Sequence, residues 1–244
     1  VNYESGSLAQ TCARSVHEAW SRLGAAEDLD LVVVDQPGRV DQSSHLEAIA
    51  GEGARIVQSP VNDGYAGGMT RGLAGTSGAD DDLVLILNPD VFLADDCLVQ
   101  LHAHLRLNQR AGLVAPRTWL DESRTFLLPT PQLPGGRTEL CDLGAARWPW
   151  LARRVAARRA RKDWKSWLTE QPLECEMLPG SCLLMRRRLL SDLGVLLDPS
   201  FPLYYEDADL CRRVQMLGQS TVLVPGAEAV HFGARCSGTG EAFE

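Results

Sequence analysis

Two short segments of this sequence carry acidic side chains that could bind a cation or act as a base. Asn88-Pro89-Asp90 follows a strongly apolar stretch, and Glu206-Asp207-Ala208-Asp209 places three carboxylates within four residues, directly after two tyrosines. A carboxylate at the end of a buried strand can bind a divalent cation that neutralises a diphosphate. A half-buried carboxylate can have a raised pKa and act as a general base. Both segments also have structural explanations: an Asn-Pro turn, and acids that stabilise a helix N-terminus.

A histidine and a glycine-bearing loop are two further candidates. His231 lies in an apolar stretch, and it is a metal ligand only if the fold brings it near Asp90; otherwise it is a core histidine. The loop 62–68 reads NDGYAGG and leads into a helix that carries Arg71. Its glycines allow close approach to a phosphate or sugar, and arginine can pair with a diphosphate. The loop matches neither Walker A nor G-x-G-x-x-G, so a tight turn explains it equally well.

Strands that alternate with helices must position these side chains. Apolar runs predict strands at 29–34, 54–57, 83–87, 113–116 and 221–224. Helical patterns are found at 8–23, 43–50, 69–75 and 95–107, and in a segment that follows 204–210 and ends near 218. This alternation predicts an α/β fold with a doubly wound, mostly parallel sheet flanked by helices. Ligands of such sheets bind beyond the carboxyl ends of the strands, where Asp35 and Asn88-Pro89-Asp90 fall.

Composition and charge narrow the class of protein. The 244 residues are 45% hydrophobic and 23% charged, and their net charge is −8, which argues against a general nucleic-acid binder. The seven cysteines include no C-x-x-C pair, so we expect free, mostly buried thiols in a cytoplasmic protein rather than disulfides or zinc. We find no signal peptide, no apolar run of about 20 residues, and no G-x-S-x-G or H-E-x-x-H motif. Val1-Asn2-Tyr3 has the pattern of the end of a strand, and we expect its first residues to lie upstream.

The order of these segments resembles the family-2 glycosyltransferases of the GT-A fold, and more narrowly their bacterial rhamnosyltransferase and galactofuranosyltransferase branch. The matching segments, in order, are VNYESG, VVVDQ, NDGYAGGMTRG, LILNPDV, LPGSCLLMRR, FPLYYEDADLCRR and AVHF. The resemblance implies one domain over 1–244. Residues 1–117 would form the nucleotide-sugar half, and 118–244 the acceptor half with a basic helical insertion at 147–168.

The resemblance also assigns roles to residues on the donor side. The residues implied to bind the donor are Val1, Tyr3, Asp35, Gly67, Arg71, Asn88 and Asp90. Val1 and Tyr3 would lie near the nucleobase, and Asp35 would hydrogen-bond it. Asn88 replaces the first Asp of the family's DxD metal motif, which leaves Asp90 and His231 as the implied ligands of Mg²⁺ or Mn²⁺.

On the acceptor side, Asp207 matches the catalytic base, and Gly180, Ser181 and Glu206 match the acceptor-facing wall. The implied reaction is an inverting transfer of a rhamnose- or galactofuranose-type sugar from a dTDP- or UDP-linked donor. The implied acceptor is a glycan or a lipid-linked glycan of cell-envelope or polysaccharide synthesis. Such a transfer needs one base for the acceptor hydroxyl and positive charge for the departing diphosphate. Asp209 is expected to hold the helix start.

Two other functions compete with this one. A nucleotidyltransferase also uses a nucleotide-binding α/β sheet and a metal, but we would expect a basic residue in its N-terminal glycine loop, which Asn2-Tyr3-Glu4-Ser5-Gly6 lacks. The third hypothesis is a non-catalytic, membrane-associated protein that retains the fold, which Asn88 in place of Asp favours.

The net charge conceals a strongly basic segment. Residues 147–165 carry a net charge of +7, and the remaining residues carry −15. Apolar residues at near-helical spacing, tryptophans among them, predict a basic amphipathic helix of the kind that binds an anionic membrane surface. We therefore expect a cytoplasmic protein that is peripheral at the inner face of the plasma membrane. A solvated helix, a lid over the active site and an RNA contact are the alternatives for this segment.

Overall fold

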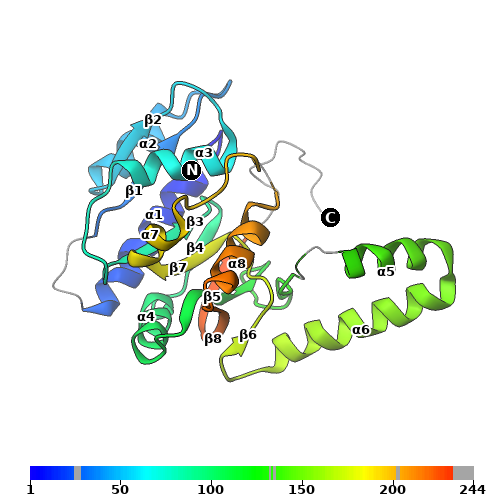
Figure 1. The fold of residues 1–244 in the computed structure, drawn as a ribbon. Coiled ribbons are helices and arrows are strands. Elements are labelled where there is room, and N and C mark those ends of the chain that lie inside the picture. Colours follow the sequence, from blue (N-terminus) through cyan, green and yellow to red (C-terminus); the bar gives the residue numbers. More distant parts are fainter. Residues whose placement is uncertain (25–28, 132, 134–135, 202–203, 233–244) are drawn as a thin grey trace.

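Strands and helices alternate through the first half of the chain (Figure 1). The computed structural model describes residues 1–24, 29–131, 133, 136–201 and 204–232. The helices are α1 (Gly6–Leu23), α2 (Ser43–Gly51), α3 (Gly64–Ala74), α4 (Cys97–Leu107), α5 (Gly136–Arg147), α6 (Pro149–Leu168), α7 (Arg188–Leu193) and α8 (Glu206–Met216). The strands are β1 (Val32–Asp35), β2 (Arg55–Gln58), β3 (Leu83–Leu87), β4 (Val91–Leu93), β5 (Ala111–Trp119), β6 (Leu173–Glu174), β7 (Cys182–Arg186) and β8 (Ser220–His231).

The strands form a parallel pair, β1 and β2, and a six-stranded sheet in the order β3-β7-β5-β8-β4, with β6 also paired to β8. Strands β5 and β8 are parallel, and β7 runs antiparallel to both β3 and β5. Strands β4 and β6 run antiparallel to β8. The predicted α/β class with flanking helices is therefore confirmed. In addition, β4, β6 and β7 run antiparallel to the strands with which they pair.

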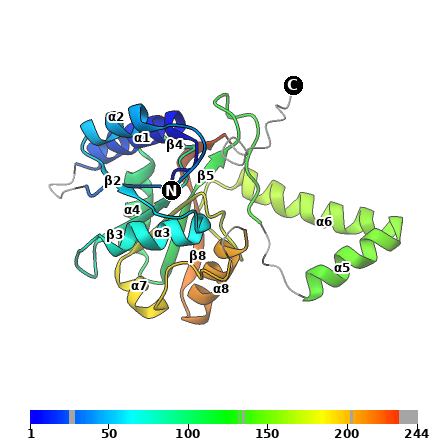
Figure 2. The same cartoon turned by 90° about the horizontal axis from the view of Figure 1, so that it is seen from above.

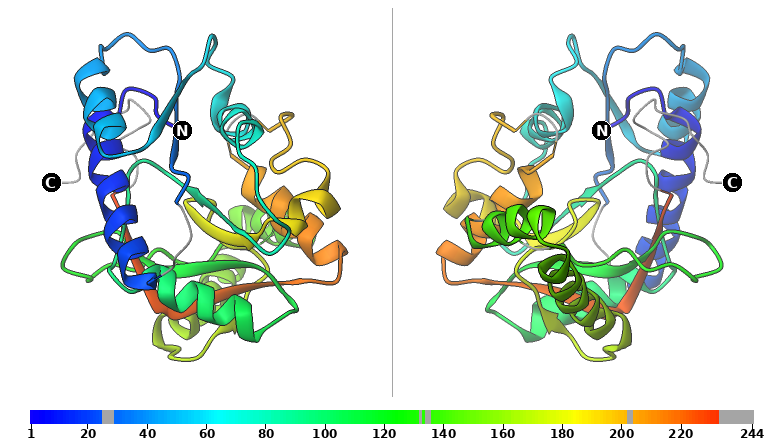
Figure 3. Two further views of the ribbon diagram at one scale, coloured as in Figure 1. Left: turned by 90° about the vertical axis from the view of Figure 1, so that its left-hand side faces the viewer. Right: turned by 90° about the vertical axis from the view of Figure 1, so that its right-hand side faces the viewer.

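Helices cover both faces of the larger sheet, with α1 and α8 on opposite sides (Figure 3). Strand β7 shows why: it is buried along its whole length, and its alternate side chains enter two different cores. Cys182 and Leu184 pack with α1 and α4, whereas Leu183 and Met185 pack with α7 and α8. This is the expected consequence of side chains that alternate between the faces of a strand.

Several predicted boundaries require correction. We predicted a loop over 62–68, but α3 already begins at Gly64, whose N–H is capped by the Asn62 side chain at 3.1 Å. The predicted segments 221–224 and Val230-His231-Phe232 belong largely to one strand, β8, which ends at His231. Strands β4 and β6 and helices α5 and α7 were not predicted. Asn2, placed at the end of a strand, forms an isolated parallel bridge with Asp35.

Helices α5 and α6 form a hairpin that extends away from the rest of the molecule (Figures 1 and 2). Buried Gly144 lies in α5 near the turn of this hairpin, and a Cβ there would come within 2.6 Å of the Leu151 side chain. The basic helical insertion predicted at 147–168 is thus a helix, α6, over Pro149–Leu168. No helix in the described part of the chain is both long enough and apolar enough to cross a bilayer. The division into donor and acceptor halves stays a prediction.

The six described cysteines are free thiols, in line with the sequence, and Cys236 lies outside the described residues. Burial raises the pKa of Cys97 and of Cys211 to about 12, so both remain protonated packing groups at neutral pH.

The core of the large sheet gives the first testable prediction. Leu113 on β5 is 0% exposed, so replacing it by Ala removes buried methyl groups and leaves a cavity, and we expect a loss of about 2–5 kcal/mol in the free energy of unfolding. Leu107 at the end of α4 is 89% exposed, and Leu107→Ala is the matched control, expected to change stability by less than about 0.5 kcal/mol. Urea denaturation of both variants measures the difference, and equal losses would contradict this assignment of the core.

Candidate active site

Sheet register brings segments that are far apart in sequence to one edge of the large sheet. Leu87, the last residue of β3, pairs with Cys182, the first residue of β7, and the Asn88 N–H donates to the Ser181 carbonyl at 2.9 Å. The turn after β3 therefore lies beside the segment before β7. Val91 at the start of β4 pairs with His231 at the end of β8, so the same turn also meets the end of β8.

The condition set for His231 is met, because the fold places it against Asp90. Nε2 of His231 lies 3.2 Å from Oδ1 of Asp90, and Asp90 is buried. Close to this pair, Oδ1 of Asn88 and Nδ1 of His231 are buried without a hydrogen-bond partner among the described residues. Buried polar atoms without partners are uncommon in folded proteins and point to an additional group that satisfies them.

These residues suit a divalent cation only in part. A carboxylate, an amide oxygen and an imidazole are acceptable ligands for Mn²⁺, and Mg²⁺ is commonly held by one or two carboxylates together with substrate phosphates. The described residues contain no group of three or more His, Cys, Asp or Glu side chains able to hold a metal. The donor set at Asn88, Asp90 and His231 therefore fits a cation whose remaining ligands come from a diphosphate.

Asp207 lies at the start of α8 and is fixed by backbone donors. Its Oδ2 accepts from the Gly180 N–H at 3.0 Å, and its Oδ1 accepts from the Ala208 N–H at 2.8 Å. A Cβ at residue 180 would lie 2.9 Å from Cβ of Asp207, so only glycine allows this approach. Burial raises the pKa of Asp207, and the two N–H donors offset part of the rise. The result is a carboxylate whose proton affinity is higher than usual, which is the property of a general base.

Three other residues lie close to this carboxylate or beside Gly180, and two of them, Glu206 and Ser181, are predicted acceptor-facing residues. Glu206 is buried, burial raises its pKa, and its Oε2 has no partner within the described structure. The hydroxyl of Ser181 is likewise buried and unpartnered in the described part of the chain. Asp209 was expected to hold the start of α8, but its carboxylate does not cap the helix. It pairs at 2.7 Å with Arg213, one turn further on, which donates to the carbonyls of residues 195 and 196.

The two tyrosines before α8 have an uncommon backbone. Tyr204 and Tyr205 both have a positive φ, of 65° and 68°, although neither is glycine. Such conformations cost free energy and persist where the surrounding structure enforces them, often at functional sites. Here they reverse the chain directly before α8, which buries Glu206 and leaves both tyrosine rings exposed.

The donor-side residues predicted from the sequence lie around β1 and α3. The side chain of Asn2 donates to Oδ1 of Asp35 at 2.7 Å, so Asp35 is held by Asn2. Val1 packs on Gly68, where a Cβ would come within 2.6 Å of the valine. Tyr3 is exposed.

Arg71 does not stand alone, because it pairs with Asp63 at 2.8 Å. Gln36 donates to the other oxygen of Asp63 at 3.1 Å and to the Gly64 carbonyl at 2.7 Å. A Cβ at residue 67 would approach the Asp63 carboxylate to 2.4 Å, which explains Gly67. Sequence reasoning assigned no role to Asp63 or Gln36. Asp63 lies within the glycine loop and Gln36 directly follows Asp35, and those positions were the available signal.

Tyr65 is the third residue that sequence reasoning missed, and it joins the two sides of the site. Its hydroxyl, on α3, donates to the Gly180 carbonyl at 3.2 Å. Burial raises the pKa of Tyr65 well above its usual value, and the carboxyl groups of Glu206, Asp207 and Asp90 add to the rise. The donor-side helix therefore reaches the segment that holds Asp207.

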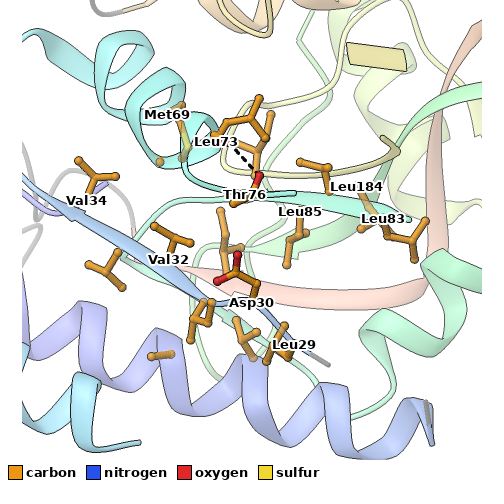
Figure 4. A pocket seen from close by; sticks show the side chains of 18 of the residues that line it. Leu29, Asp30, Val32, Val34, Met69, Leu73, Thr76, Leu83, Leu85 and Leu184 are labelled. Carbon is orange, nitrogen blue, oxygen red and sulfur yellow. Dashed lines mark hydrogen bonds between the residues drawn. The ribbon is translucent and has the colours of Figure 1, made fainter. Parts of the chain in front are cut away.

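A separate apolar cavity of about 680 Å³ lies between β1 and β3 (Figure 4). Side chains from β1, α3 and β3 point into it, among them Val32, Val34, Met69, Leu73 and Leu85. Of the predicted site residues, only Val1 lines it. The cavity therefore separates the two sheets and does not coincide with the candidate chemistry.

Comparison with known proteins agrees with this geometry. Residues 2–242 match the sequence profile described as glycosyltransferase-like family 2. Over 196 residues the chain is 30% identical to N-acetylglucosaminyl-diphospho-decaprenol L-rhamnosyltransferase of Mycobacterium tuberculosis, in strains CDC 1551 / Oshkosh and H37Rv. That match covers 75% of this chain and 60% of each relative, so the chain matches less than two thirds of the length of these curated relatives.

Solved structures show the same fold. Mannosyltransferase PcManGT from Pyrobaculum calidifontis, in complex with GDP-Man and Mn²⁺, superposes with a TM-score of 0.63 at 16% identity over 96% of this chain and 55% of that chain. GalNAc-T7 with UDP, GalNAc and Mn²⁺ gives 0.61 at 13% identity, over 91% and 40%. TarS from S. aureus gives 0.56 at 12% identity, over 93% and 35%. These neighbours have the GT-A fold, as predicted.

The profile match spans almost the whole chain. The order of the motifs in the sequence, the fold and the curated relatives all point to the same family. The chain therefore belongs to glycosyltransferase-like family 2.

Proposed function

We propose that this chain catalyses inverting transfer of a sugar from a nucleotide-diphospho-sugar to an acceptor hydroxyl. One observation carries the proposal: a carboxylate of raised pKa, Asp207, is fixed by the Gly180 N–H on the same sheet edge where Asp90 meets His231. A base and a cation-binding pair at one edge correspond to the two needs of glycosyl transfer, deprotonation of the acceptor and neutralisation of the departing diphosphate.

In this mechanism Asp207 accepts the proton of the acceptor hydroxyl as the oxygen attacks the anomeric carbon. The raised pKa increases the proton affinity of the carboxylate. Asn88, Asp90 and His231 would hold Mg²⁺ or Mn²⁺, which when bound supplies positive charge to the diphosphate. Arg71, now paired with Asp63, lies on the donor side and is a second source of positive charge.

The substrate assignment follows the curated relatives. Their name describes transfer of rhamnose to a lipid-linked N-acetylglucosaminyl-diphosphate. We propose a rhamnose- or galactofuranose-type sugar on dTDP or UDP, and a glycan or lipid-linked acceptor in cell-envelope or polysaccharide synthesis. A nucleotidyltransferase and a non-catalytic protein that retains the fold are the alternatives, and no contact at the site favours either.

The α5–α6 hairpin supports a peripheral position on an anionic membrane at the cytoplasmic face. Trp148, which directly precedes α6, and Trp150, in its first turn, are 50% and 59% exposed. Arg153, Arg154 and Arg158 on the same helix are also exposed. Tryptophan rings suit the lipid interface, and arginines suit anionic headgroups. A lipid-linked acceptor would be presented at that surface.

Replacing the base tests the reaction directly. Asp207→Asn keeps the shape of the side chain but removes its proton affinity, so we expect transfer to fall by about 10²–10⁴-fold while nucleotide binding persists. Asp209→Asn, on the same turn, breaks only the ion pair to Arg213 and should lower stability rather than kcat. Product formation from a panel of dTDP- and UDP-sugars measures both variants. Full activity of Asp207→Asn would exclude Asp207 as the base.

Metal dependence is tested by nucleotide binding. Calorimetric titration of the wild-type chain with UDP and dTDP should give affinity with Mn²⁺ that falls at least about tenfold in EDTA, because the cation joins the diphosphate to the protein. In Asp90→Asn and His231→Gln the difference between Mn²⁺ and EDTA should shrink. Equal binding in both buffers would contradict the cation site, and no binding in either would favour the non-catalytic alternative.

The membrane proposal predicts charge-dependent binding to vesicles. Arg153→Glu together with Arg158→Glu should weaken binding to phosphatidylglycerol vesicles by at least about tenfold, because each basic residue near an anionic surface contributes roughly 1 kcal/mol. Arg106→Glu with Arg110→Glu reverses two exposed charges elsewhere and is the matched control. Co-sedimentation with vesicles measures both pairs. If the two double substitutions weaken vesicle binding equally, α6 is not the segment that contacts the membrane.

A further inference from the structure

We propose that Tyr65 is a positioning residue that fixes the position of the Asp207 carboxylate by holding Gly180. It thereby links the donor-side helix α3 to the base. The inference rests on the proposed function and deepens it. It is carried by a chain of contacts that joins α3, the segment before β7, and α8.

Residue 180 is contacted from both sides. Its carbonyl accepts from the Tyr65 hydroxyl at 3.2 Å, and its N–H donates to Oδ2 of Asp207 at 3.0 Å. The side-chain-free Cα lies so close to Asp207 that a Cβ would stand 2.9 Å from the aspartate Cβ. Because glycine has the freest backbone of all residues, its position depends on external contacts. The tyrosine hydroxyl is such a contact, and any shift of Gly180 moves the donor of the Asp207 hydrogen bond.

The Tyr65 hydroxyl stays a donor under working conditions. Burial and the nearby carboxyl groups of Glu206, Asp207 and Asp90 keep its pKa well above the usual range, and the buried Cys182 thiol acts in the same direction. The group is therefore protonated and neutral across the pH range in which the protein works. A permanent neutral donor positions Gly180 without adding charge beside the base.

The same turn of α3 belongs to the donor side. Two residues before Tyr65, Asp63 pairs with Arg71, and Gln36 donates to both the Asp63 carboxylate and the Gly64 carbonyl. A donor diphosphate that engages Arg71 acts on the turn that also carries Tyr65. We therefore place the link between donor binding and the base at this hydroxyl.

The link makes a directional prediction about pH. The titratable groups that face Asp207 are Glu206 and Cys211 on α8 and Tyr65 on α3. The Gly180 N–H lowers the pKa of Asp207, so a looser Gly180 raises it. Since the base must be ionised, the fall of kcat at low pH should then begin at a higher pH.

Tyr65→Phe tests the inference, because it removes only the hydroxyl. We expect kcat at neutral pH to fall by about 3–10-fold, the range for loss of one hydrogen bond, and the low-pH limb of kcat to move up by about half a unit or more. The KM for the donor should stay within about twofold. Ser21→Ala is the control, since it removes one exposed hydroxyl on α1 that bonds only the Glu18 carbonyl, and it should change neither quantity.

A second measurement does not depend on turnover. NMR titration of ¹³C-labelled aspartate carboxyls, with the Asp207 signal assigned by its loss in Asp207→Asn, reports the pKa of the base directly. A higher pKa in Tyr65→Phe than in wild type supports the link. An unchanged pKa overturns it, as does a loss of kcat with an unmoved pH limb, which would mark a purely structural role. If wild type transfers no sugar, the proposed function fails, and this titration still decides the role of Tyr65.

Discussion

The antiparallel pairing of β7 with β3 is the constraint on which the site depends. Since β7 begins where β3 ends, the turn 88–90 and the residues Gly180 and Ser181 meet without any long loop. The pairing of β4 with β8 does the same for Asp90 and His231, because β4 starts where β8 ends. Helix α8 then needs only one sharp reversal, at Tyr204 and Tyr205, to bring Asp207 to this edge. Sheet register thus sets the contact of Asp90 with His231 and places Ser181 beside the turn 88–90.

The buried acids at this edge of the sheet favour ligands that bring positive charge and hydrogen-bonding groups. Asp90 and Glu206 are buried, Asp207 is half-buried, and burial raises the pKa of both Glu206 and Asp207. Unpartnered polar atoms of Asn88, Ser181 and Glu206 remain within the described residues. Buried acids and unsatisfied polar atoms cost stability when a site is empty, and a cation and a sugar rich in hydroxyl groups can satisfy them. The same groups therefore lower the stability of the free protein and stabilise the complex with a ligand.

The sequence predicted the parts of the fold that local patterns encode. The strand 83–87 has the predicted bounds because five apolar residues end at an Asn-Pro turn, and α6 lies within the predicted basic segment. The antiparallel strands and the short β4 could not be predicted, since pairing is decided between distant segments. The roles of Tyr65 and Gln36 could not be predicted for the same reason. The hydrogen-bond partner of Tyr65 lies 115 residues away, and those of Gln36 lie 27 and 28 residues away. The role of Asp207 came from family resemblance, because its own segment was equally compatible with a helix cap.

The apolar cavity between β1 and β3 lies between the β1–β2 pair and the six-stranded sheet. Strands β1 and β2 share a small core with α2 and one side of α1 around Ile49, whereas α1 also packs on the six-stranded sheet. Asp207 on α8 and the Asp90–His231 pair lie at the six-stranded sheet. Local opening at low free energy is drawn from regions with few buried contacts, and a cavity marks such a boundary. Under the proposed function the donor side lies on the smaller core, so we expect it to open locally more readily than the residues that hold Asp207. Donor preference can then change on the β1–β2 side without moving the contacts of Asp207 with the segment before β7.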